Sequence, residues 1–263
     1  MPKIKEDKGY KGYFIDLDGT VYRGKQRIPA ASRFIERLQK ENKKILFLTN
    51  NSTREPASVA QNLRENHNIN VEVKNVYTSA LATADYLDQL AGVKRKVYVV
   101  GEKGLKLALK QKDFILTKEQ PDYVVVGLDS DVTYEKLTAA VLFIRNGATF
   151  IGTNADSNIP NQRGMLPGAG SLIKLVEYAT QKAPIMIGKP EKIIMEMALE
   201  REKLTKDQVL MVGDNYLTDI KGAMNAGVDS LLVYTGLSTP EQVSYYDQQP
   251  TYQINSLDEW VVR

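Results

Sequence analysis

Two aspartates separated by one residue follow the first apolar run of the chain, and a glycine comes directly after them. The run is Gly12 to Ile15, the aspartates are Asp16 and Asp18, and the glycine is Gly19. Carboxylates at positions i and i+2 of an extended strand point to the same side, so they can lie close together over one small site. Gly19 permits the tight turn that must follow. The segment therefore predicts a compact carboxylate site at a strand end.

Three later apolar runs also end in polar side chains. Together with the two aspartates they supply carboxylates, one lysine and one hydroxyl. Phosphoryl transfer needs this inventory: a nucleophile in line with the leaving group, a hard cation and fixed positive groups on the phosphoryl oxygens. The polar groups are Thr49-Asn50-Asn51-Ser52 after residues 45–48, Gly188-Lys189-Pro190 after 185–187, and Gly213-Asp214-Asn215, with Asp219 close behind, after 209–212.

The residue types suggest a role for each carboxylate. Asp16 is the candidate nucleophile, because an aspartate can form an acyl phosphate and divide one difficult displacement into two easier ones. Asp18 is the candidate general acid and base, and a neighbouring carboxylate and partial burial would keep it protonated part of the time. The carboxylates of Asp16 and Asp214, joined by the main-chain carbonyl of Asp18, are the expected ligands of Mg²⁺.

The remaining polar groups are expected to bind the substrate. The Thr49 hydroxyl, the Lys189 ammonium group and N–H groups near Asn50 are placed to contact the oxygens of the transferring phosphoryl group. Asp219 follows near the start of a helix. We expect it to orient Lys189 or a water on the metal.

One pattern recurs along the chain: a short apolar run, a polar turn and a segment with helical spacing. Continuous apolar strands separated by helices indicate a parallel sheet that is covered on both faces. Ligands of such sheets bind where the strands end at their carboxyl edge, which is where the polar groups lie. The predicted strands span residues 12–15, 45–48, 97–100, 123–126, 148–151, 185–187, 209–212 and 230–233.

Two helix starts carry clear capping signals. Thr133 is placed to cap a helix over residues 134–145, which stops at Asn146-Gly147. Thr239-Pro240-Glu241-Gln242 places a capping-box pair around a proline at the first helical position. The predicted fold class is therefore α/β.

The polar motifs occur in an order that resembles a known family. DLDGT, TNNS, GKP and GDN followed by TD are similar to the four motifs of the haloacid dehalogenase (HAD) superfamily of phosphotransferases. The TNNS form and the long insertion before GKP resemble subfamily IIA, the NagD-like or p-nitrophenylphosphatase-like enzymes. The chain departs from the pattern at Asn215-Tyr216, where many relatives have Arg-Leu.

This resemblance implies both a fold and an activity. The fold is a Rossmann-like parallel-sheet HAD core over residues 1–78 and 184–263, with an inserted α/β cap domain over residues 79–183. The activity is Mg²⁺-dependent hydrolysis of small phosphomonoesters, such as nucleotide, sugar or glycerol phosphates, through a phosphoaspartate on Asp16.

Composition restricts the location and the partners. Hydrophobic residues make up 43% and charged residues 25%, as in an ordinary globular protein. The formal charge of +3 is spread along the chain, which argues against nucleic-acid binding. There is no cysteine, no apolar run of membrane-spanning length and no apolar stretch near the start that would act as a signal peptide. We expect a cytoplasmic enzyme with no membrane partner that acts on a small phosphorylated metabolite, and a homodimer is compatible with these features.

The same residues allow other interpretations. Asp16 to Gly19 could begin a calcium loop, but the twelfth position would then be Arg27 and not an acidic residue. A phosphotransferase on the same fold would share the motifs. A regulatory phosphate-binding protein on this fold should lose the nucleophile or the acid, but Asp16 and Asp18 are both present, and a dehalogenase would not need Asp18, Asp214 or a metal site. His67 lies in a polar stretch and is expected on the surface. The polar segment 152–170 is expected to form either a surface loop or a loop facing the active site, with Asn154, Asp156 and Arg163 as candidate substrate contacts.

Overall fold

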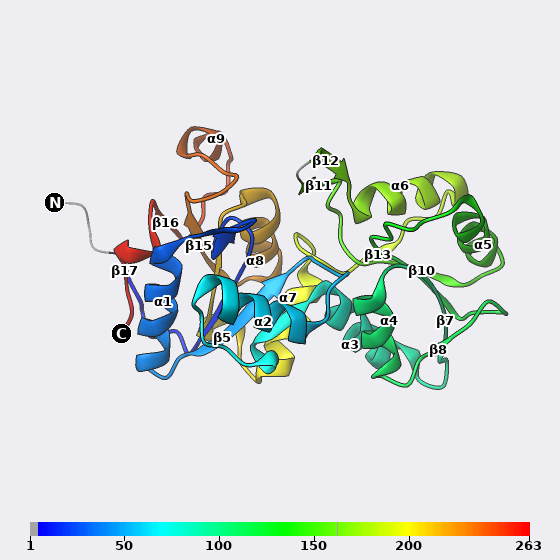
Figure 1. Ribbon diagram of the computed structural model, residues 1–263, viewed down its shortest axis with the longest axis horizontal. Coiled ribbons are helices and arrows are strands. Elements are labelled where there is room, and N and C mark those ends of the chain that lie inside the picture. The colour runs from blue at the N-terminus through cyan, green and yellow to red at the C-terminus, as the bar shows by residue number, and fades with distance from the viewer. Residues whose placement is uncertain (1–4, 162) are drawn as a thin grey trace. The chain divides into compact units, whose positions relative to one another are not determined.

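The computed structural model describes residues 5–161 and 163–263, and the chain divides into two compact units (Figure 1). The first unit contains the described residues up to Thr49, together with Pro56–Tyr77 and Lys189–Arg263. The second unit contains Asn50–Glu55 and Thr78–Gly188. The chain therefore leaves the first unit twice before it returns for good at Lys189.

Within the described residues, the first unit is built on a six-stranded sheet in the order β16, β15, β14, β2, β5, β6. The pairs β2–β5, β2–β14, β14–β15 and β15–β16 are all parallel. Every residue of β2 and β14 is buried, which explains why these strands are apolar on both faces. The strands are β2 (Gly12–Ile15), β5 (Lys44–Thr49), β6 (Val76–Thr78), β14 (Val209–Gly213), β15 (Asp229–Val233) and β16 (Tyr252–Ile254).

Helices and short elements complete the first unit. Two short pairs, β1–β17 and β3–β4, form two-stranded sheets separate from the main sheet. The helices are α1 (Pro29–Lys40), α2 (Pro56–His67), α7 (Lys192–Glu202), α8 (Lys221–Ala226) and α9 (Pro240–Ser244). The short strands are β1 (Lys5–Glu6), β3 (Tyr22–Arg23), β4 (Gln26–Arg27) and β17 (Trp260–Val261). Single helical turns are η1 (Val73–Asn75), η2 (Lys206–Gln208) and η4 (Leu257–Glu259), and η3 (Tyr216–Ile220) is a π-helix.

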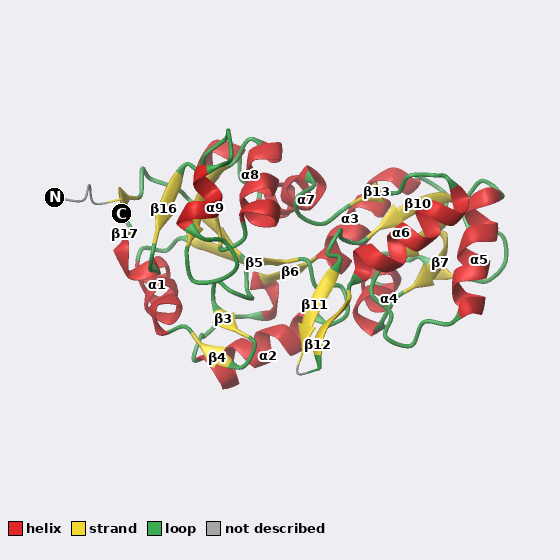
Figure 2. Ribbon diagram, turned by 90° about the horizontal axis from the view of Figure 1, so that it is seen from above, coloured by secondary structure: helices red, strands yellow, loops and turns green. Residues whose placement is uncertain are grey.

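The second unit, as far as it is described, has its own five-stranded parallel sheet in the order β13, β10, β9, β7, β8, with helices beside it (Figure 2). Its core joins strand residues such as Val124 to Ile144 of α5 and Ile173 of α6. The strands are β7 (Lys96–Val100), β8 (Ile115–Leu116), β9 (Tyr123–Val126), β10 (Thr149–Gly152) and β13 (Ile185–Met186). The helices are α3 (Ser79–Ala91), α4 (Lys103–Lys110), α5 (Tyr134–Arg145) and α6 (Ala169–Thr180).

The structure contains a strand at each of the eight predicted positions, with ends shifted by at most one residue. Both capping predictions are confirmed: the Thr133 hydroxyl accepts from Lys136 N, and Thr239 forms a capping box with Gln242. The segment 152–170 is not one loop, because it holds the antiparallel hairpin of β11 (Asn158–Asn161) and β12 (Gly164–Pro167) before α6 begins. No helix in the described ranges combines the length and apolar character needed to cross a membrane.

The prediction that His67 lies on the surface is wrong. Only 4% of the residue is exposed, and its ring stacks on Tyr22 with 4.4 Å between the ring centroids. The β3–β4 hairpin covers the end of α2, and Arg27 Nε donates to the main-chain oxygen of Asn66. The polar residues around His67 in sequence do not reveal this contact, because it comes from a hairpin far away in the chain. His67 Nδ1 finds no hydrogen-bond partner among the described residues.

This environment makes the stability of the protein depend on pH. Burial, with the nearby positive charge of Arg27, lowers the pKa of His67 below its ordinary value of 6.5. Its contribution to stability is therefore complete above pH 6.5 and is lost as the pH falls from there through the lower pKa of the folded state. His67→Phe keeps an aromatic ring and removes both nitrogens. We expect this variant to be more stable than the unmodified protein by about 1 kcal/mol at pH 8, because a buried acceptor without a partner is removed.

The gain in the free energy of unfolding should be larger at pH 5 than at pH 8, as measured by urea denaturation of both proteins at both pH values. A gain that is the same at pH 5 and pH 8 would contradict the shifted pKa.

Candidate active site

The sheet of the first unit brings the predicted acidic motifs to one edge. In the register of β2 and β14, Ile15 lies opposite Val212, and the main-chain nitrogen of Asp16 donates to Val212 O over 2.9 Å. Asp16 and Asp214 therefore leave the carboxyl ends of neighbouring parallel strands. On the other side of β2, Ile15 lies opposite Phe47 of β5, which ends at Thr49.

Among the described residues, three carboxylates gather here. Asp16, Asp214 and Asp219 each offer an oxygen, and these oxygens all lie within 4.8 Å of one another. Asp214 and Asp219 are each 1% exposed, and the side chain of Asp16 is 14% exposed. Asp219 comes from the π-helix η3, and its Oδ2 accepts from the main-chain nitrogen of Asn215 over 3.0 Å. Single π-helical turns are rare and occur frequently at functional sites.

The ammonium group of Lys189 lies between two of these carboxylates. Its Nζ donates to Asp16 Oδ1 over 2.6 Å, to Asp219 Oδ1 over 2.7 Å and to the main-chain oxygen of Leu48 over 2.9 Å. The residue is 1% exposed. Burial alone would lower the pKa of Lys189, but the attraction of Asp16 and Asp219 outweighs it and holds the pKa above its ordinary value. The lysine is therefore a permanent cation.

Burial and mutual repulsion act in the opposite direction on the carboxylates. Burial and the negative charge of Asp219 raise the pKa of Asp16 well above its ordinary value, although Lys189 opposes the shift. The same two causes raise the pKa of Asp214 to about 6. Two buried carboxylates and the partly buried Asp16 share one buried ammonium group, so the cluster carries excess negative charge once its acids ionise. Such a cluster gains stability from a second positive charge.

The hydrogen bonds of Asp214 leave room for that charge. Oδ1 accepts from the Thr20 hydroxyl over 2.9 Å, and Oδ2 accepts from the main-chain nitrogen of Leu237 over 2.8 Å. A carboxylate oxygen has more than one lone pair, so each can also bind a cation. An all-oxygen donor set of carboxylates suits a hard divalent cation such as Mg²⁺ or Ca²⁺. The residues present therefore fit a divalent metal.

Three glycines let the backbone approach these carboxylates. A Cβ atom on Gly19 would lie 2.3 Å from Asp214 Oδ2, and one on Gly236 would lie 1.8 Å from the same oxygen. A Cβ atom on Gly213 would lie 2.3 Å from Cβ of Asp219. Gly19 also has a φ of +95°, which favours glycine for a second reason. Any larger residue at these positions would displace a carboxylate.

Asp18 differs from its prediction in one respect. Its side chain is exposed, and Oδ1 accepts from the main-chain nitrogen of Gly24 over 3.1 Å. The expected partial burial is therefore wrong, because the turn at Gly19 directs the chain back towards Tyr22 and leaves Asp18 uncovered. The Asp18 carboxylate is not part of the three-carboxylate group. Its exposure leaves it accessible to water.

The predicted phosphate-binding residues fall in both units. Thr49 is 9% exposed at the end of β5 in the first unit. Asn50 belongs to the second unit, where its Nδ2 donates to Asp156 Oδ1 over 3.1 Å. Its main-chain oxygen accepts from Asn154 Nδ2 over 2.8 Å. Asn154 and Asp156, two of the candidate substrate contacts, are thus hydrogen-bonded to Asn50. The third candidate, Arg163, is exposed in the β11–β12 hairpin, and its main-chain nitrogen donates to Asn161 Oδ1.

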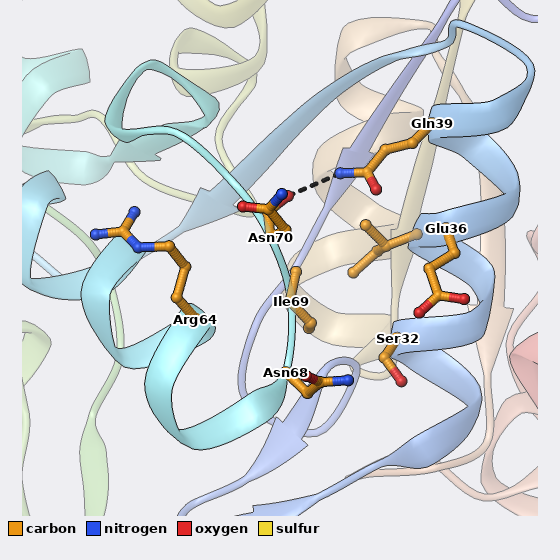
Figure 3. A pocket seen from close by; sticks show the side chains of 8 residues that line it. Ser32, Glu36, Gln39, Arg64, Asn68, Ile69 and Asn70 are labelled. Atoms are coloured by element: carbon orange, nitrogen blue, oxygen red, sulfur yellow. Dashed lines mark hydrogen bonds between the residues drawn. The ribbon is translucent and has the colours of Figure 1, made fainter.

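A surface pocket of about 310 Å³ lies elsewhere in the first unit (Figure 3). The pocket lies between α1, the end of α2 and the segment that follows α2. Two of its lining residues are hydrogen-bonded, because Gln39 Nε2 donates to Asn70 O. None of the predicted site residues lines it. The lining residues are Ser32, Ile35, Glu36, Gln39, Arg64, Asn68, Ile69 and Asn70.

Sequence reasoning missed one part of the site, the segment after β15. Gly236 and Leu237 contact Asp214 through the backbone, and the Thr235 hydroxyl donates to the main-chain oxygen of Gly19 over 2.7 Å. The location of this segment could have been predicted, because β15 was predicted and its carboxyl end lies at the same edge of the sheet. A backbone N–H, however, is present in nearly every residue and marks no motif.

Comparisons with known proteins identify the family of this chain. A family model described as haloacid dehalogenase-like hydrolase matches residues 13–115, and a second model, for HAD-like hydrolases, matches residues 186–260. The chain is 48% identical to an acid sugar phosphatase of Staphylococcus aureus over 254 residues, which cover 96% of this chain and 97% of that protein.

Two solved structures extend the comparison. A mutant of the thermostable p-nitrophenylphosphatase from Bacillus stearothermophilus is 49% identical, with a TM-score of 0.89, and the match covers 96% of this chain and 98% of that one. NagD from Escherichia coli K-12 is 30% identical, also with a TM-score of 0.89, and the match covers 95% of this chain and 98% of that one.

The burial of Lys189 leads to a testable consequence for stability. In the metal-free protein, Lys189→Met leaves the carboxylates without their cation, and we expect the free energy of unfolding at pH 8 to fall by about 3 to 5 kcal/mol. The pKa of Asp16, already raised, should rise further. A raised carboxyl pKa contributes stability that is present at low pH and lost as the pH rises through the folded-state value. The deficit should therefore shrink between pH 8 and pH 5.

Urea denaturation in the presence of a chelator measures this deficit at both pH values. Lys192→Met is a matched control, because Lys192 pairs with Glu196 on the surface and its loss should change stability little. A small, pH-independent deficit for Lys189→Met would show that the buried charges are not balanced in this way.

Proposed function

This chain belongs to the haloacid dehalogenase-like hydrolases, and we propose that it is a Mg²⁺-dependent phosphatase that hydrolyses small phosphomonoesters through a phosphoaspartate on Asp16. The observation that carries the proposal is the group of three carboxylates with the Lys189 ammonium group among them. Phosphoryl transfer depends on a positioned nucleophile and on fixed positive charge around the phosphoryl oxygens. The names of the relatives, acid sugar phosphatase and p-nitrophenylphosphatase, support phosphomonoesters, with sugar phosphates foremost.

Asp16 is suited to be the nucleophile. Its Oδ1 accepts from Lys189, so we assign Oδ2 as the oxygen that attacks phosphorus. The bond between phosphorus and the leaving oxygen breaks as the acyl phosphate forms, and the leaving alkoxide takes a proton from Asp18. Asp18 then removes a proton from water, which attacks phosphorus and releases inorganic phosphate and the Asp16 carboxylate. The exposure of Asp18 suits this second step, because water must reach it.

A divalent cation would be held by Asp16, Asp214 and the main-chain carbonyl of Asp18, and we propose Mg²⁺. When bound, the cation supplies positive charge that offsets the repulsion between the substrate phosphate and the carboxylates. Asp219 lies in the same group, but Lys189 Nζ and Asn215 N engage its two oxygens. We therefore assign Asp219 to holding Lys189 in place. Thr49 and the Asn50 backbone would contact the phosphoryl oxygens, and Lys189 would do so by exchanging one of its three hydrogen bonds to protein oxygens for one to the phosphoryl group.

We infer that the inserted unit acts as a cap that selects the substrate. The proposal rests on chain connectivity: the insertion leaves the first unit directly after Thr49 and Tyr77 and returns at Lys189. Two of these three junction residues belong to the proposed phosphate-binding set. The cap would comprise residues 79–183 with the short segments that join it to the core. A cytoplasmic location fits a chain without cysteine, because its fold requires no oxidising compartment.

The nucleophile assignment is tested by Asp16→Asn. An amide cannot form the acyl phosphate, so we expect kcat for p-nitrophenyl phosphate to fall by at least about a thousandfold. The unmodified protein should require Mg²⁺ and lose activity in a chelator. The matched control is Asp131→Asn, an aspartate whose side chain is fully exposed, which should retain full activity. Near-normal turnover by a folded Asp16→Asn variant, or activity that survives thorough chelation, would refute the proposal.

The role of Asp18 is tested by Asp18→Asn with two kinds of leaving group. Nitrophenolate needs little protonation, so formation of the phosphoenzyme should be slowed much less for p-nitrophenyl phosphate than for an alkyl phosphate. Hydrolysis of the phosphoaspartate should be slow with either substrate, because the base is missing. Stopped-flow measurements should then show a burst of about one nitrophenolate per protein molecule. Equal losses for aryl and alkyl phosphates, with no burst, would remove Asp18 from this role.

A further inference from the structure

The segment after β15, residues 235–238, makes close contacts with Asp214, and we call it the clamp segment. Leu237 N donates to Asp214 Oδ2 over 2.8 Å, and Ser238 N donates to the main-chain oxygen of Asp214 over 3.1 Å. Gly236 lies so close that a Cβ atom there would be 1.8 Å from Asp214 Oδ2. The clamp segment thus fixes both the carboxylate and the backbone of Asp214.

The clamp segment also reaches the turn that carries the other acidic motif. The Thr235 hydroxyl donates to the main-chain oxygen of Gly19 over 2.7 Å, and Arg23 Nε donates to the main-chain oxygen of Thr235. The two strand ends that deliver Asp16 and Asp214 are therefore joined through this one segment. Four consecutive residues without an ionisable side chain make all of these contacts.

A pair of stacked tyrosines is connected to the clamp segment by a hydrogen bond. Ser238 Oγ accepts from the main-chain nitrogen of Tyr216 over 2.8 Å. The Tyr216 ring is 3% exposed and stacks on Tyr246, with 4.0 Å between centroids and 4° between planes. Its hydroxyl donates to Gln248 O over 2.7 Å. Tyr216 lies two residues after Asp214, and Tyr246 lies eight residues after the clamp segment. The stack therefore connects the chain near Asp214 with the chain that follows the clamp segment.

An apolar cluster anchors the stack to the sheet. Tyr216, Val243 of α9 and Leu232 of β15 are buried together, and Tyr246 packs against them. One residue, Thr239, separates the clamp segment from α9, which begins at Pro240 and ends two residues before Tyr246. The segment from the clamp segment through α9 to Tyr246 is therefore held at its far end by the packing of Tyr246 against Tyr216.

We propose that the Tyr216–Tyr246 stack is a positioning device that sets the affinity of Asp214 for its divalent cation. The inference rests on the proposed function, in which Asp214 is a metal ligand. A carboxylate already fixed by its neighbours loses little freedom when it binds a cation, whereas a loosely held one must be ordered first. Tyr216 and Tyr246 are not among the proposed ligands of the metal or of the phosphoryl group, and in this proposal they act through Ser238 and Leu237.

The test is Mg²⁺ binding by calorimetry to the full chain without substrate. Tyr246→Ala removes the stack, and we expect the Kd for Mg²⁺ to rise about tenfold, as is typical when a partner of a metal ligand is lost. Tyr246→Phe keeps the stacked ring and should restore the original Kd. With p-nitrophenyl phosphate, the lost activity of Tyr246→Ala should return at saturating Mg²⁺, so that kcat recovers while the Mg²⁺ requirement stays shifted.

A matched control separates positioning from general packing. Tyr252 of β16 packs edge-on against Trp260, with 4.9 Å between centroids, and is partly buried like Tyr246. We expect both Tyr252→Ala and Tyr246→Ala to lower the melting temperature, but Tyr252→Ala should leave the Kd for Mg²⁺ unchanged. Ser238→Ala breaks the link between stack and clamp segment with little loss of packing and should also raise the Kd, which keeps the test decisive if Tyr246→Ala fails to fold.

The outcomes are distinct. If the unmodified protein and Asp214→Ala bind Mg²⁺ equally, the proposed metal site itself is wrong. If Asp214→Ala loses binding but neither Tyr246→Ala nor Ser238→Ala changes the Kd, the metal site stands and the positioning role is overturned. If Tyr252→Ala raises the Kd as much as Tyr246→Ala, the effect is general destabilisation and the positioning role is likewise overturned.

Discussion

The ammonium group of Lys189 is the interaction on which the candidate site depends. It joins four separate elements, because it binds Asp16 after β2, Leu48 O within β5 and Asp219 in η3, and itself follows β13 in the chain. Burying a charge without partners costs much free energy, so these contacts are what stabilise the lysine in its buried position. The same contacts hold the carboxylates closer together than their own repulsion would allow.

The charge balance is incomplete, because three carboxylates lie in one group with a single lysine. The excess negative charge raises the pKa of Asp16 and Asp214 and at the same time makes the cluster attractive to a divalent cation. The glycines at 19, 213 and 236 add a steric constraint, because they bring the backbone against the carboxylates from several sides. The charges and the closely packed backbone thus fix the positions of the same carboxylates.

Much of this could be predicted from the sequence, because buried parallel strands leave a clear pattern and their carboxyl ends meet at one edge. The strands, two capped helices and the α/β class were predicted correctly, and the comparisons confirm the family. The surface position of His67 and the partial burial of Asp18 were predicted wrongly, because both depend on how the β3–β4 hairpin and its preceding turn pack. The roles of the site residues, the domain limits at 79–183 and a homodimer stay predictions. The clamp segment was missed because it acts through main-chain groups, which carry no residue-type signal.

The pairing of β2 with β14 has a consequence for how the chain is made. Lys189 and Asp16 lie 173 residues apart in sequence, and β14 occupies the place between β2 and β15 in the finished sheet. During synthesis from the N-terminus, β2 and β5 emerge long before β14, so one side of β2 stays unpaired while the rest of the chain is translated. An apolar strand with an open edge is prone to pair with other chains. The second unit, almost continuous in sequence, can complete its own sheet during this interval. This topology therefore allows the second unit to be folded while the sheet of the first unit is still half assembled.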